Sequence, residues 1–402
     1  MENQAIQRVP VVVVGGGLIG SAAACAMDAA GIECLALEAG ANPPSFDLNP
    51  DDAHKEDART GAVAHGAARF LDKIGVWRHV APYAGEIRRI RTSEGDSRGF
   101  LDYGSALCGD EPMGYMAPNA ALLAGLRRRM AEAKNLTVRY HAKVSALDAP
   151  NAGPVSIRTE SGEIFHADVA LISDGRRSSL RDMLGIPARR HDYRQTAIIC
   201  TVKHEEEHDK TALELFLPEG PFASLPMRDP HVSGVVWTTR SDDAERYLAL
   251  PEGEFLSELN LRLGNYTGEV TEVYRKAAYP LFLVHAKRYA KGGAVLIGDA
   301  AHGIHPLAGQ GFNLGLRGVE LLFDMLNVRR RTGLPLVSAA EFSRFEALRR
   351  RDAMELIAVT HGLNALFALS SPSARFLRQA GMAALNRITP VKRLLVRRAM
   401  GA

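Results

Sequence analysis

A glycine-rich segment near the N-terminus constrains the fold of this 402-residue chain more than any other feature. Residues 11–14 (VVVV) predict a buried β-strand, and residues 15–20 (GGGLIG) follow it directly. This is the G-x-G-x-x-G pattern of a dinucleotide-binding β-α-β unit. Gly15 would make the tight turn, Gly17 would let the backbone approach a pyrophosphate, and Gly20 would let the helix pack against the strand. The alternative is an ordinary glycine-rich turn between a strand and a helix.

The predicted helix over residues 22–30 and the acidic residue that follows it complete this unit. The free N–H groups at the start of the helix would bind the pyrophosphate, with Leu18 and Ile19 in the same turn. Glu38 stands at the end of the next hydrophobic run. Its carboxylate would accept hydrogen bonds from the hydroxyls of an adenosine ribose and would repel a 2′-phosphate. These elements in this order predict nucleotide binding.

The choice of nucleotide depends on a second segment far along the chain. Residues 294–297 (AVLI) predict another buried strand, which leads into Gly298 and Asp299. A tightly held FAD is long, and it would gain from a carboxylate on its ribityl chain, here Asp299. A helix that begins near Gly311 would supply N–H groups and direct its positive end at the N1 and C2=O region of the flavin. The pattern favours FAD over a nicotinamide dinucleotide, and the alternative is a simple turn at Gly298.

A third segment lies between these two. Residues 168–173 predict a strand, Asp174 and Gly175 a turn, and Ser178 the N-cap of a helix that contains Arg181. Three such motifs in this order resemble the single-component (class A) flavoprotein aromatic hydroxylases. In that family the middle motif contributes to binding both FAD and NAD(P)H. The chain has no second G-x-G-x-x-G, so no separate nicotinamide domain is expected.

One segment of the sequence restricts the resemblance to a smaller group of these hydroxylases. Residues 305–317 (HPLAGQGFNLGLR) are similar to the HPxAGQGxNLGLRD signature of the ubiquinone-biosynthesis hydroxylases (UbiH/VisC-like). The likeness extends over almost the whole chain from about residue 9, and includes residues 57–59, 114–122, 217–223, 279–281 and 344–352. Gly318 stands where the family usually carries Asp, at a position that we expect on a helix surface.

The resemblance implies a set of residues around FAD. Arg59 would reach the ribityl or pyrophosphate region, and Asn119 and Leu122 the middle of the cofactor. Val144 would contact the adenine through its backbone. The residues that would line the active site are Pro306, Gly309 and Gln310. The complete predicted cofactor site is Gly15, Gly17, Leu18, Ile19, Gly20, Glu38, Arg59, Asn119, Leu122, Val144, Asp174, Gly298, Asp299, Pro306, Gly309, Gln310, Gly311, Phe312 and Asn313.

The resemblance also implies the chemistry. NAD(P)H would reduce FAD, O₂ would form a flavin C4a-hydroperoxide, and one oxygen atom would enter the ring of a polyprenyl-phenol or quinone precursor of ubiquinone. Two alternatives stay open: a hydroxylase of a soluble aromatic compound, and a non-catalytic flavin-binding assembly subunit. No side chain is identified as catalytic. His302 and His305 are interpreted as residues that structure the loop, and no metal site is expected.

These expectations define an α/β fold. A Rossmann-like FAD-binding domain of the glutathione-reductase type would comprise residues 1–75, 100–185 and 285–335. An antiparallel β-sheet substrate domain would comprise residues 76–99 and 186–284, and a C-terminal helical region residues 336–402. Within residues 41–135 we expect mainly helices and loops.

Composition limits location and partners. The four cysteines have no metal-ligand spacing and suit a reducing cytoplasm. We expect no signal peptide, and no apolar run approaches the ~20 residues of a membrane span. A net charge of +3 without a basic–aromatic pattern does not indicate nucleic acid. The oligomeric state stays open.

The C-terminal segment is basic. No Asp or Glu follows Glu355, and residues 391–398 (VKRLLVRR) predict a short helix with one apolar and one cationic side. This helix would either lie on an anionic membrane surface or pack on the domain with a solvated basic face. The expected location is therefore the cytoplasm, with peripheral binding to the inner membrane as an open alternative.

Overall fold

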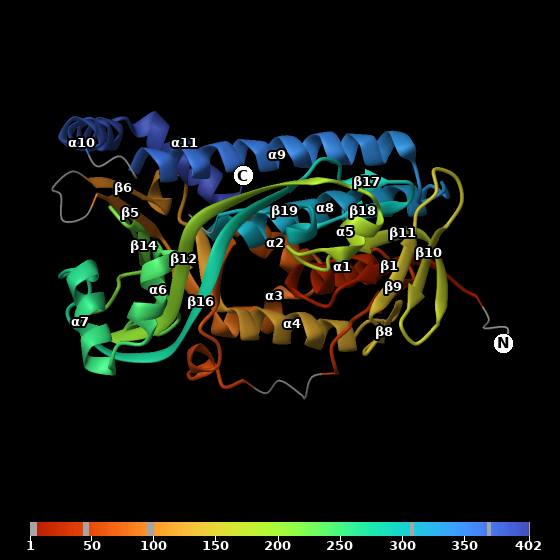
Figure 1. Cartoon of the computed structure of the whole chain (residues 1–402), viewed down its shortest axis with the longest axis horizontal. Helices are drawn as coiled ribbons and strands as arrows, with labels where there is room; N and C mark the ends of the chain where they lie inside the picture. The colour runs from red at the N-terminus through yellow and green to blue at the C-terminus, as the bar shows by residue number, and fades with distance from the viewer. Residues whose placement is uncertain (1–5, 43–47, 95–99, 306–308, 368–370, 402) are drawn as a thin grey trace.

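The computed structural model describes residues 6–42, 48–94, 100–305, 309–367 and 371–401. Two large β-sheets lie at opposite ends of the molecule, and two long strands, β12 (Ala188–His204) and β16 (Val270–Ala286), curve from one end toward the other (Figure 1). Helix α9 (Ala339–Phe367) runs along one side over much of the length of the molecule.

The first sheet carries the N-terminal β-α-β unit. Its parallel strands have the order β18-β11-β1-β2-β8, and β17 adds an antiparallel edge. A β9–β10 hairpin extends from β11. The bounds are β1 Gln7–Val14, β2 Cys34–Leu37, β8 Leu136–Arg139, β9 Val144–Asp148, β10 Val155–Thr159, β11 Ile164–Ile172, β17 Ala290–Lys291 and β18 Ala294–Leu296.

The second sheet has the order β19-β16-β12-β15-β14-β13-β5-β6 and is antiparallel except for the β13–β5 pair. Its other strands are β5 Arg89–Ser93, β6 Phe100–Gly104, β13 Thr211–Leu217, β14 Gly220–Pro226, β15 Val232–Arg240 and β19 His302–Gly303. A small third sheet, β3-β7-β4, consists of β3 Thr60–Ala64, β4 Gly85–Ile87 and β7 Gly114–Pro118.

Helices cover these sheets. The remaining α-helices are α1 Leu18–Ala29, α2 His65–Lys73, α3 Trp77–Val80, α4 Asn119–Ala131, α5 Ser179–Met183, α6 Ser241–Leu248, α7 Glu252–Leu263, α8 Gln310–Arg331, α10 Pro372–Arg387 and α11 Thr389–Met400. Short 3₁₀ helices are η1 Ala53–Lys55, η2 Ala81–Tyr83, η3 Ser105–Leu107 and η4 Gly298–Ala300.

Helix α1 shows how the sequence produces this packing. It contacts β1, β2, α4 and α8, and is therefore enclosed by the first sheet and two helices. A helix that is surrounded must be apolar or small on all sides. Its middle, residues 22–27 (AAACAM), is fully buried, and the small side chains allow the neighbouring elements to approach.

The structure corrects one expectation and leaves another untested. Residues 41–135 contain five strands, β3 to β7, in addition to helices. Strands β4 and β5 lie within residues 76–99, which were assigned to the sheet domain, but the prediction of mainly helices and loops was wrong for β3, β6 and β7. Glycine and β-branched residues in short runs concealed these strands, because strands of three to five residues carry little periodicity. The second sheet also includes β6, beyond residue 99. The proposed domain boundaries themselves stay a prediction.

Candidate cofactor and active site

Three parallel strands of the first sheet end side by side at the site. Val14, the last residue of β1, is paired with Ile172 at the end of β11, and Ile172 is paired with Leu296 at the end of β18. The glycine turn, the Asp-Gly segment and the Gly-Asp segment follow these three ends. The carboxyl edge of parallel strands is where open α/β sheets bind ligands. The fold therefore unites three motifs that lie up to nearly three hundred residues apart.

The glycine turn is formed by close backbone contacts. Gly15 has φ +105°, and a Cβ atom there would lie 2.5 Å from the carbonyl oxygen of Ser173. A Cβ at Gly20 would lie 1.8 Å from the carbonyl oxygen of Gly15. At Gly17, by contrast, a Cβ would meet no atom within 4 Å. Two glycines thus permit packing, while the third faces open space at the start of α1, where a pyrophosphate would approach.

Ile19 joins the glycine turn to the distant Gly-Asp segment. A Cβ at Gly298 would lie 3.0 Å from Cγ2 of Ile19, and a Cβ at Gly315 would lie 2.5 Å from its Cδ1. The Ile19 side chain therefore packs against η4 and α8 and is partly buried. Leu18 packs at the edge of the same core. The Asp299 segment lies directly beside the turn, as a single cofactor bridging both motifs requires.

Glu38 lies beside the glycine turn and beside the segment before Val144. Its carboxylate accepts hydrogen bonds from the backbone N–H groups of Gly16 and Gly40, the latter over 2.7 Å. Its own backbone is bonded on both sides, since its N–H donates to Arg139 and its carbonyl accepts from Ala142. Two residues further on, Val144 begins β9. The predicted ribose and adenine contacts are therefore neighbours in space.

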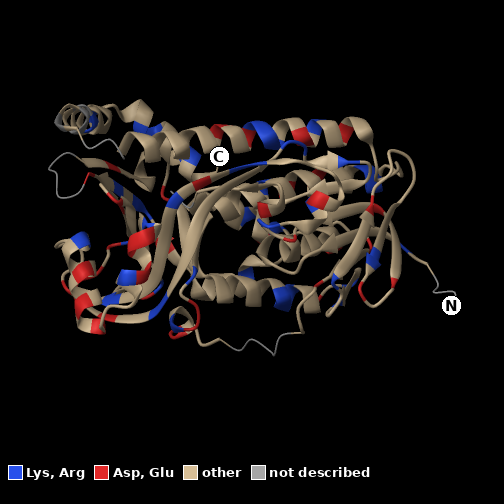
Figure 2. Cartoon of the chain, viewed as in Figure 1, with Lys and Arg blue, Asp and Glu red and all other residues tan. Residues whose placement is uncertain are grey.

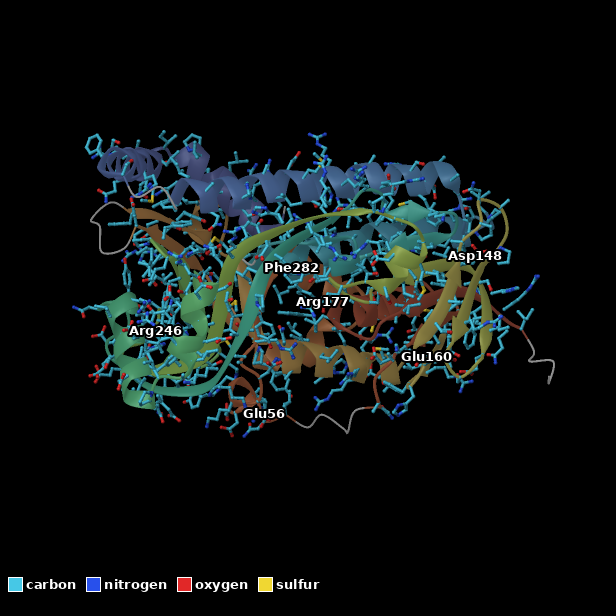
Figure 3. All side chains as sticks on the ribbon, viewed as in Figure 1. Glu56, Asp148, Glu160, Arg177, Arg246 and Phe282 are labelled. Atoms are coloured by element: carbon cyan, nitrogen blue, oxygen red, sulfur yellow. The ribbon has the colours of Figure 1, made fainter. Side chains whose placement is uncertain are left out.

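Two arginines hold the Gly-Asp segment. Nε of Arg176 lies 3.1 Å from Oδ2 of Asp299, and the same guanidinium donates to the carbonyl oxygens of Phe282 and Ile304. Arg181 is fully buried and donates to the carbonyl oxygen of Ala300 over 3.1 Å. The middle motif thus positions the loop that carries Asp299. Figure 3 labels Phe282 and Arg177, the neighbour of Arg176, near the centre of the molecule.

The carboxylate of Asp174 has one oxygen that a ligand could bind. One of its oxygens accepts from the N–H of Leu180 over 3.2 Å, while Oδ1 is buried and has no hydrogen-bond partner in the described part of the chain. A buried carboxylate oxygen without a partner is costly, so it points to a ligand or an ordered water.

The start of α8 is fixed to the third sheet. Gly309, in the left-handed region at φ +60°, precedes the helix, and a Cβ there would lie 2.9 Å from Cβ of Ala62. Asn313 is buried, accepts from the N–H of Ala64 over 2.8 Å and donates to the carbonyl of Ala62 over 2.9 Å. Its role is therefore to anchor the helix. No side chain of the described residues caps α8, which leaves its first N–H groups for a ligand. Gln310, Gly311 and Phe312 form the first turn, and Pro306 lies outside the described residues.

The remaining predicted residues lie around β3. Asn119 begins α4, and its N–H donates to the carbonyl of Arg59 over 3.0 Å. Oδ1 of Asn119 is buried and has no hydrogen-bond partner among the residues that the structure describes, and a Cβ at Gly61 would lie 3.0 Å from it. Leu122 is buried in the hydrophobic core that β1, β2 and α1 share. The Arg59 guanidinium forms an ion pair with Asp57 over 2.9 Å and remains half exposed.

These observations fit FAD. The fit rests on the open space at Gly17, on two uncapped helix starts, and on the unpartnered oxygens of Asp174 and Asn119. The first helix start would receive the diphosphate, and the second the flavin end. The individual contacts stay predictions. Among the described residues no group of His, Cys, Asp and Glu could hold a metal ion.

His302 and His305 are buried within this region. Burial lowers the pKa of each imidazole to about 4, so both are neutral at physiological pH. The ring of His305 contacts that of Tyr193 at 4.9 Å between centroids, and the ring of His302 contacts that of Tyr289 at 5.6 Å. Their neutral, enclosed state agrees with the interpretation of these residues as structural.

Gly318 corrects another expectation. It is buried in α8 and faces α9, and a Cβ there would lie 3.9 Å from Cδ of Arg349. The prediction of a surface position was wrong. Sequence reasoning also missed the role of Arg176, although its place directly after Asp174 and Gly175 was an available signal, since such turns often carry ligand-binding side chains.

Comparison with known proteins relates this chain to an FAD-binding family and to ubiquinone hydroxylases. The profile of the FAD binding domain family matches residues 8–331, and that of squalene epoxidase matches residues 270–397. Ubiquinone hydroxylase UbiL of Rhodospirillum rubrum is 39% identical over 97% of this chain and 89% of its own length. The 3-demethoxyubiquinol 3-hydroxylase of Escherichia coli is 29% identical over 98% of this chain and 99% of its own length.

Solved structures share the fold. The p-nitrophenol 4-monooxygenase PnpA of Pseudomonas putida DLL-E4 superimposes with a TM-score of 0.79 at 20% sequence identity, over 97% of each chain. The predicted fold class, an α/β FAD-binding domain interleaved with an antiparallel sheet and followed by C-terminal helices, is confirmed.

Proposed function

Because the chain belongs to the family of FAD-dependent monooxygenases that includes the ubiquinone hydroxylases, we propose that it hydroxylates the ring of a prenylated phenol or quinone precursor in ubiquinone biosynthesis. The observation that carries the proposal is the contact of Ile19 with Gly298. This contact places the turn expected at the diphosphate directly beside the loop expected at the flavin end. The protein is an FAD-dependent enzyme that uses NAD(P)H and O₂.

Bound FAD, reduced by NAD(P)H, supplies the activated oxygen atom that enters the ring. The residues of this chain position and enclose that chemistry. Asp299 would accept hydrogen bonds from the ribityl hydroxyls, and Arg176 orients its carboxylate through the 3.1 Å contact. The start of α8 would stabilise negative charge at the flavin end, since its N–H groups are uncapped. Apolar side chains of the second sheet would exclude water from the ring.

Complementation is the direct test. The chain is expressed in a strain that lacks a ubiquinone ring hydroxylase, and the quinone intermediates are identified by mass spectrometry. We expect the accumulated precursor to disappear and the hydroxylated product to form. An unchanged precursor, together with FAD bound and NAD(P)H oxidised without hydroxylated product, would instead support a non-catalytic or uncoupled flavoprotein. Turnover of a soluble aromatic compound in place of the prenylated compound would identify the protein as a hydroxylase of soluble aromatic compounds.

The C-terminal helices bear on how a prenylated substrate is reached. Among the described residues, no helix is both long enough and apolar enough to cross a bilayer. Helices α10 and α11 carry no acidic residue (Figure 2). They expose Phe376 at 70% and Leu394 at 56%, while Val396 is fully buried against the domain. Helix α11 is therefore packed on one side, and its other side is apolar and cationic.

We propose that the exposed sides of α10 and α11 contact an anionic membrane surface. Apolar side chains would enter the headgroup region, and each nearby Arg would add ~1 kcal/mol. Cosedimentation with vesicles containing anionic lipid is the test. We expect binding that weakens in Phe376→Ser/Leu394→Ser, with Leu261→Ser on α7 as the control for loss of an exposed leucine. Equal binding by both variants would contradict the proposal.

A further inference from the structure

The two faces of the second sheet have different surroundings. Leu213 and Leu215 of β13 belong to a buried cluster with Trp237, and α6 and α7 cover this cluster. Since side chains alternate along a strand, Glu214 lies on the opposite face, which we call the inner face. Glu214 is therefore the acidic residue of β13 that is directed away from the helix-covered side.

Glu214 stands in a row of side chains that crosses six strands of the inner face. The strand pairs Thr92–Glu214, Glu214–Ala223, Ala223–Val236, Val236–Ile199 and Ile199–Ala277 define this row. Apart from Thr92, every neighbour of Glu214 in the row is apolar. Ile199, Val236 and Ala277 are only partly buried, although they lie in the interior strands of the sheet.

The inner face is directed at the predicted flavin end. Gly234, two residues before Val236 on β15, shares this face, and a Cβ there would lie 2.9 Å from Oγ1 of Thr60 on β3. Ala62, two residues further along β3, lies 2.9 Å from the position of a Cβ at Gly309. Strand β3 is thus in contact with the inner face through Thr60 and with the start of α8 through Ala62.

Glu214 has no hydrogen bond or ion pair among the described residues. Burial raises the pKa of its carboxyl to about 8. Tyr103 of β6 is the titratable group nearby, and burial raises the pKa of its phenol to about 12. Phe216, two residues along β13, stacks on Phe367 of α9 with ring centroids 3.6 Å apart, and this stack covers one end of the face. The Glu214 side chain keeps part of its surface accessible.

We propose that Glu214 binds the ring hydroxyl of the phenolic substrate and thereby fixes which ring carbon faces the flavin end. The inference rests on the proposed function. A prenylated phenol is apolar except at its ring oxygens, so a single polar group in an apolar row is sufficient to orient it. A carboxyl can accept the hydrogen bond of the hydroxyl and, when protonated, can also donate one. A solitary carboxyl in apolar surroundings is expensive to keep, which favours a ligand-binding role over a structural one.

The experiment measures binding rather than turnover. A short-chain ortho-prenylphenol and its methyl ether are titrated into the FAD-loaded protein, and the perturbation of flavin absorbance reports the dissociation constant. The methyl ether keeps the shape but loses the O–H donor. The wild type should bind the phenol about tenfold more tightly than the ether, as expected for one buried hydrogen bond.

Two variants and a control separate the explanations. Glu214→Leu should bind the phenol and the ether equally, and Glu214→Gln should keep most of the preference, because an amide still donates and accepts. Glu254→Leu, at an exposed position on α7, should behave as the wild type. The flavin content and the thermal unfolding midpoint of each variant verify that it is folded.

The outcomes are distinct for the two proposals. A wild type that complements the hydroxylase-deficient strain but does not prefer the phenol would overturn the role of Glu214 alone. That role would also be overturned if Glu214→Leu kept the preference. A wild type that neither complements nor binds either probe would overturn the proposed function and the role of Glu214 with it.

Discussion

The carboxyl edge of the first sheet and the inner face of the second sheet provide binding groups in different ways. At the edge, glycines bring backbone atoms together, and the groups predicted to bind the ligand are mostly N–H groups at helix starts. On the inner face, side chains from six strands form the surface, and one carboxyl stands among apolar neighbours. Backbone sites require particular residues at fixed spacing, and side-chain surfaces do not. The first region can therefore be recognised in the sequence as a motif. The residues of the second can be identified only when the pairing of the strands is known.

The largest effect should come from filling the glycine turn. In Gly20→Ala the added Cβ would lie 1.8 Å from a backbone oxygen of Gly15 and 2.3 Å from Oγ of Ser173. Neither the helix nor the turn can yield without loss of packing, so we expect the free energy of unfolding to fall by roughly 3 kcal/mol or more. Chemical denaturation measures this change. Gly362→Ala in α9, where a Cβ meets nothing within 4 Å, is the control. Equal stability of the two variants would mean that the turn is not tightly packed.

Acid should destabilise both regions through buried neutral histidines. Burial lowers the pKa to about 4 for His302 beside the first region and for His204 in the second sheet, from an ordinary value near 6.5. Between these two pH values the unfolded chain binds more protons than the folded chain. The contribution of each histidine to the free energy of unfolding is therefore fully present above pH 6.5 and is lost as the pH falls toward 4. The loss is on the order of 3 kcal/mol for each histidine.

Denaturation at a series of pH values measures this dependence. His302→Gln and His204→Gln should each reduce the slope, and His361→Gln, at an exposed position on α9, should leave it unchanged. If only one of the buried histidines affects the slope, acid acts on one region and spares the other.

Loss of the Asp299 carboxylate should weaken cofactor retention more than folding. Asp299 is partly exposed, and its ion pair with Arg176 lies at the surface of the site. We expect Asp299→Ala to raise the dissociation constant of FAD by roughly ten- to a hundredfold, as the loss of hydrogen bonds to a charged group implies. Flavin fluorescence during dialysis measures it. Asp242→Ala on α6 is the matched control, since this aspartate is exposed and lies away from the first sheet. Unchanged FAD affinity in Asp299→Ala would remove this residue from the site.

The smallest effect should appear where α8 leaves the site. Gly318 lies inside a helix, and an added Cβ would make only an ordinary contact at 3.9 Å with Arg349. Gly318→Ala should therefore raise the free energy of unfolding by about 0.5–1 kcal/mol, because alanine loses less backbone entropy than glycine in a helix. Thermal unfolding measures the gain. A decrease would show that this part of α8 is packed as tightly as the glycine turn.

Sequence reasoning succeeded where local chemistry has one structural solution. The strand before Gly15 is β1, and the helix of residues 391–398 lies within α11. Glu38 directly follows β2, as expected. Sequence reasoning failed for β3 and β7, which pair with each other although they are far apart in the sequence, and for β6, which pairs with β5. It also misplaced Gly318, because the pattern of one helix does not reveal which second helix will cover it. Arg176 was visible as a residue, but its contact with Asp299 spans 123 positions.

The sequence by itself determined the nucleotide-binding unit, since glycine spacing, a valine strand and an acid are local requirements of backbone geometry. Only the tertiary structure decided which residues share a surface. Strand pairing placed Glu214 beside Ala223, which is itself paired with Val236 of β15. Packing between distant segments brought the Asp299 loop to Ile19. Such neighbours depend on register and packing between distant segments, and no local pattern of residues contains that information.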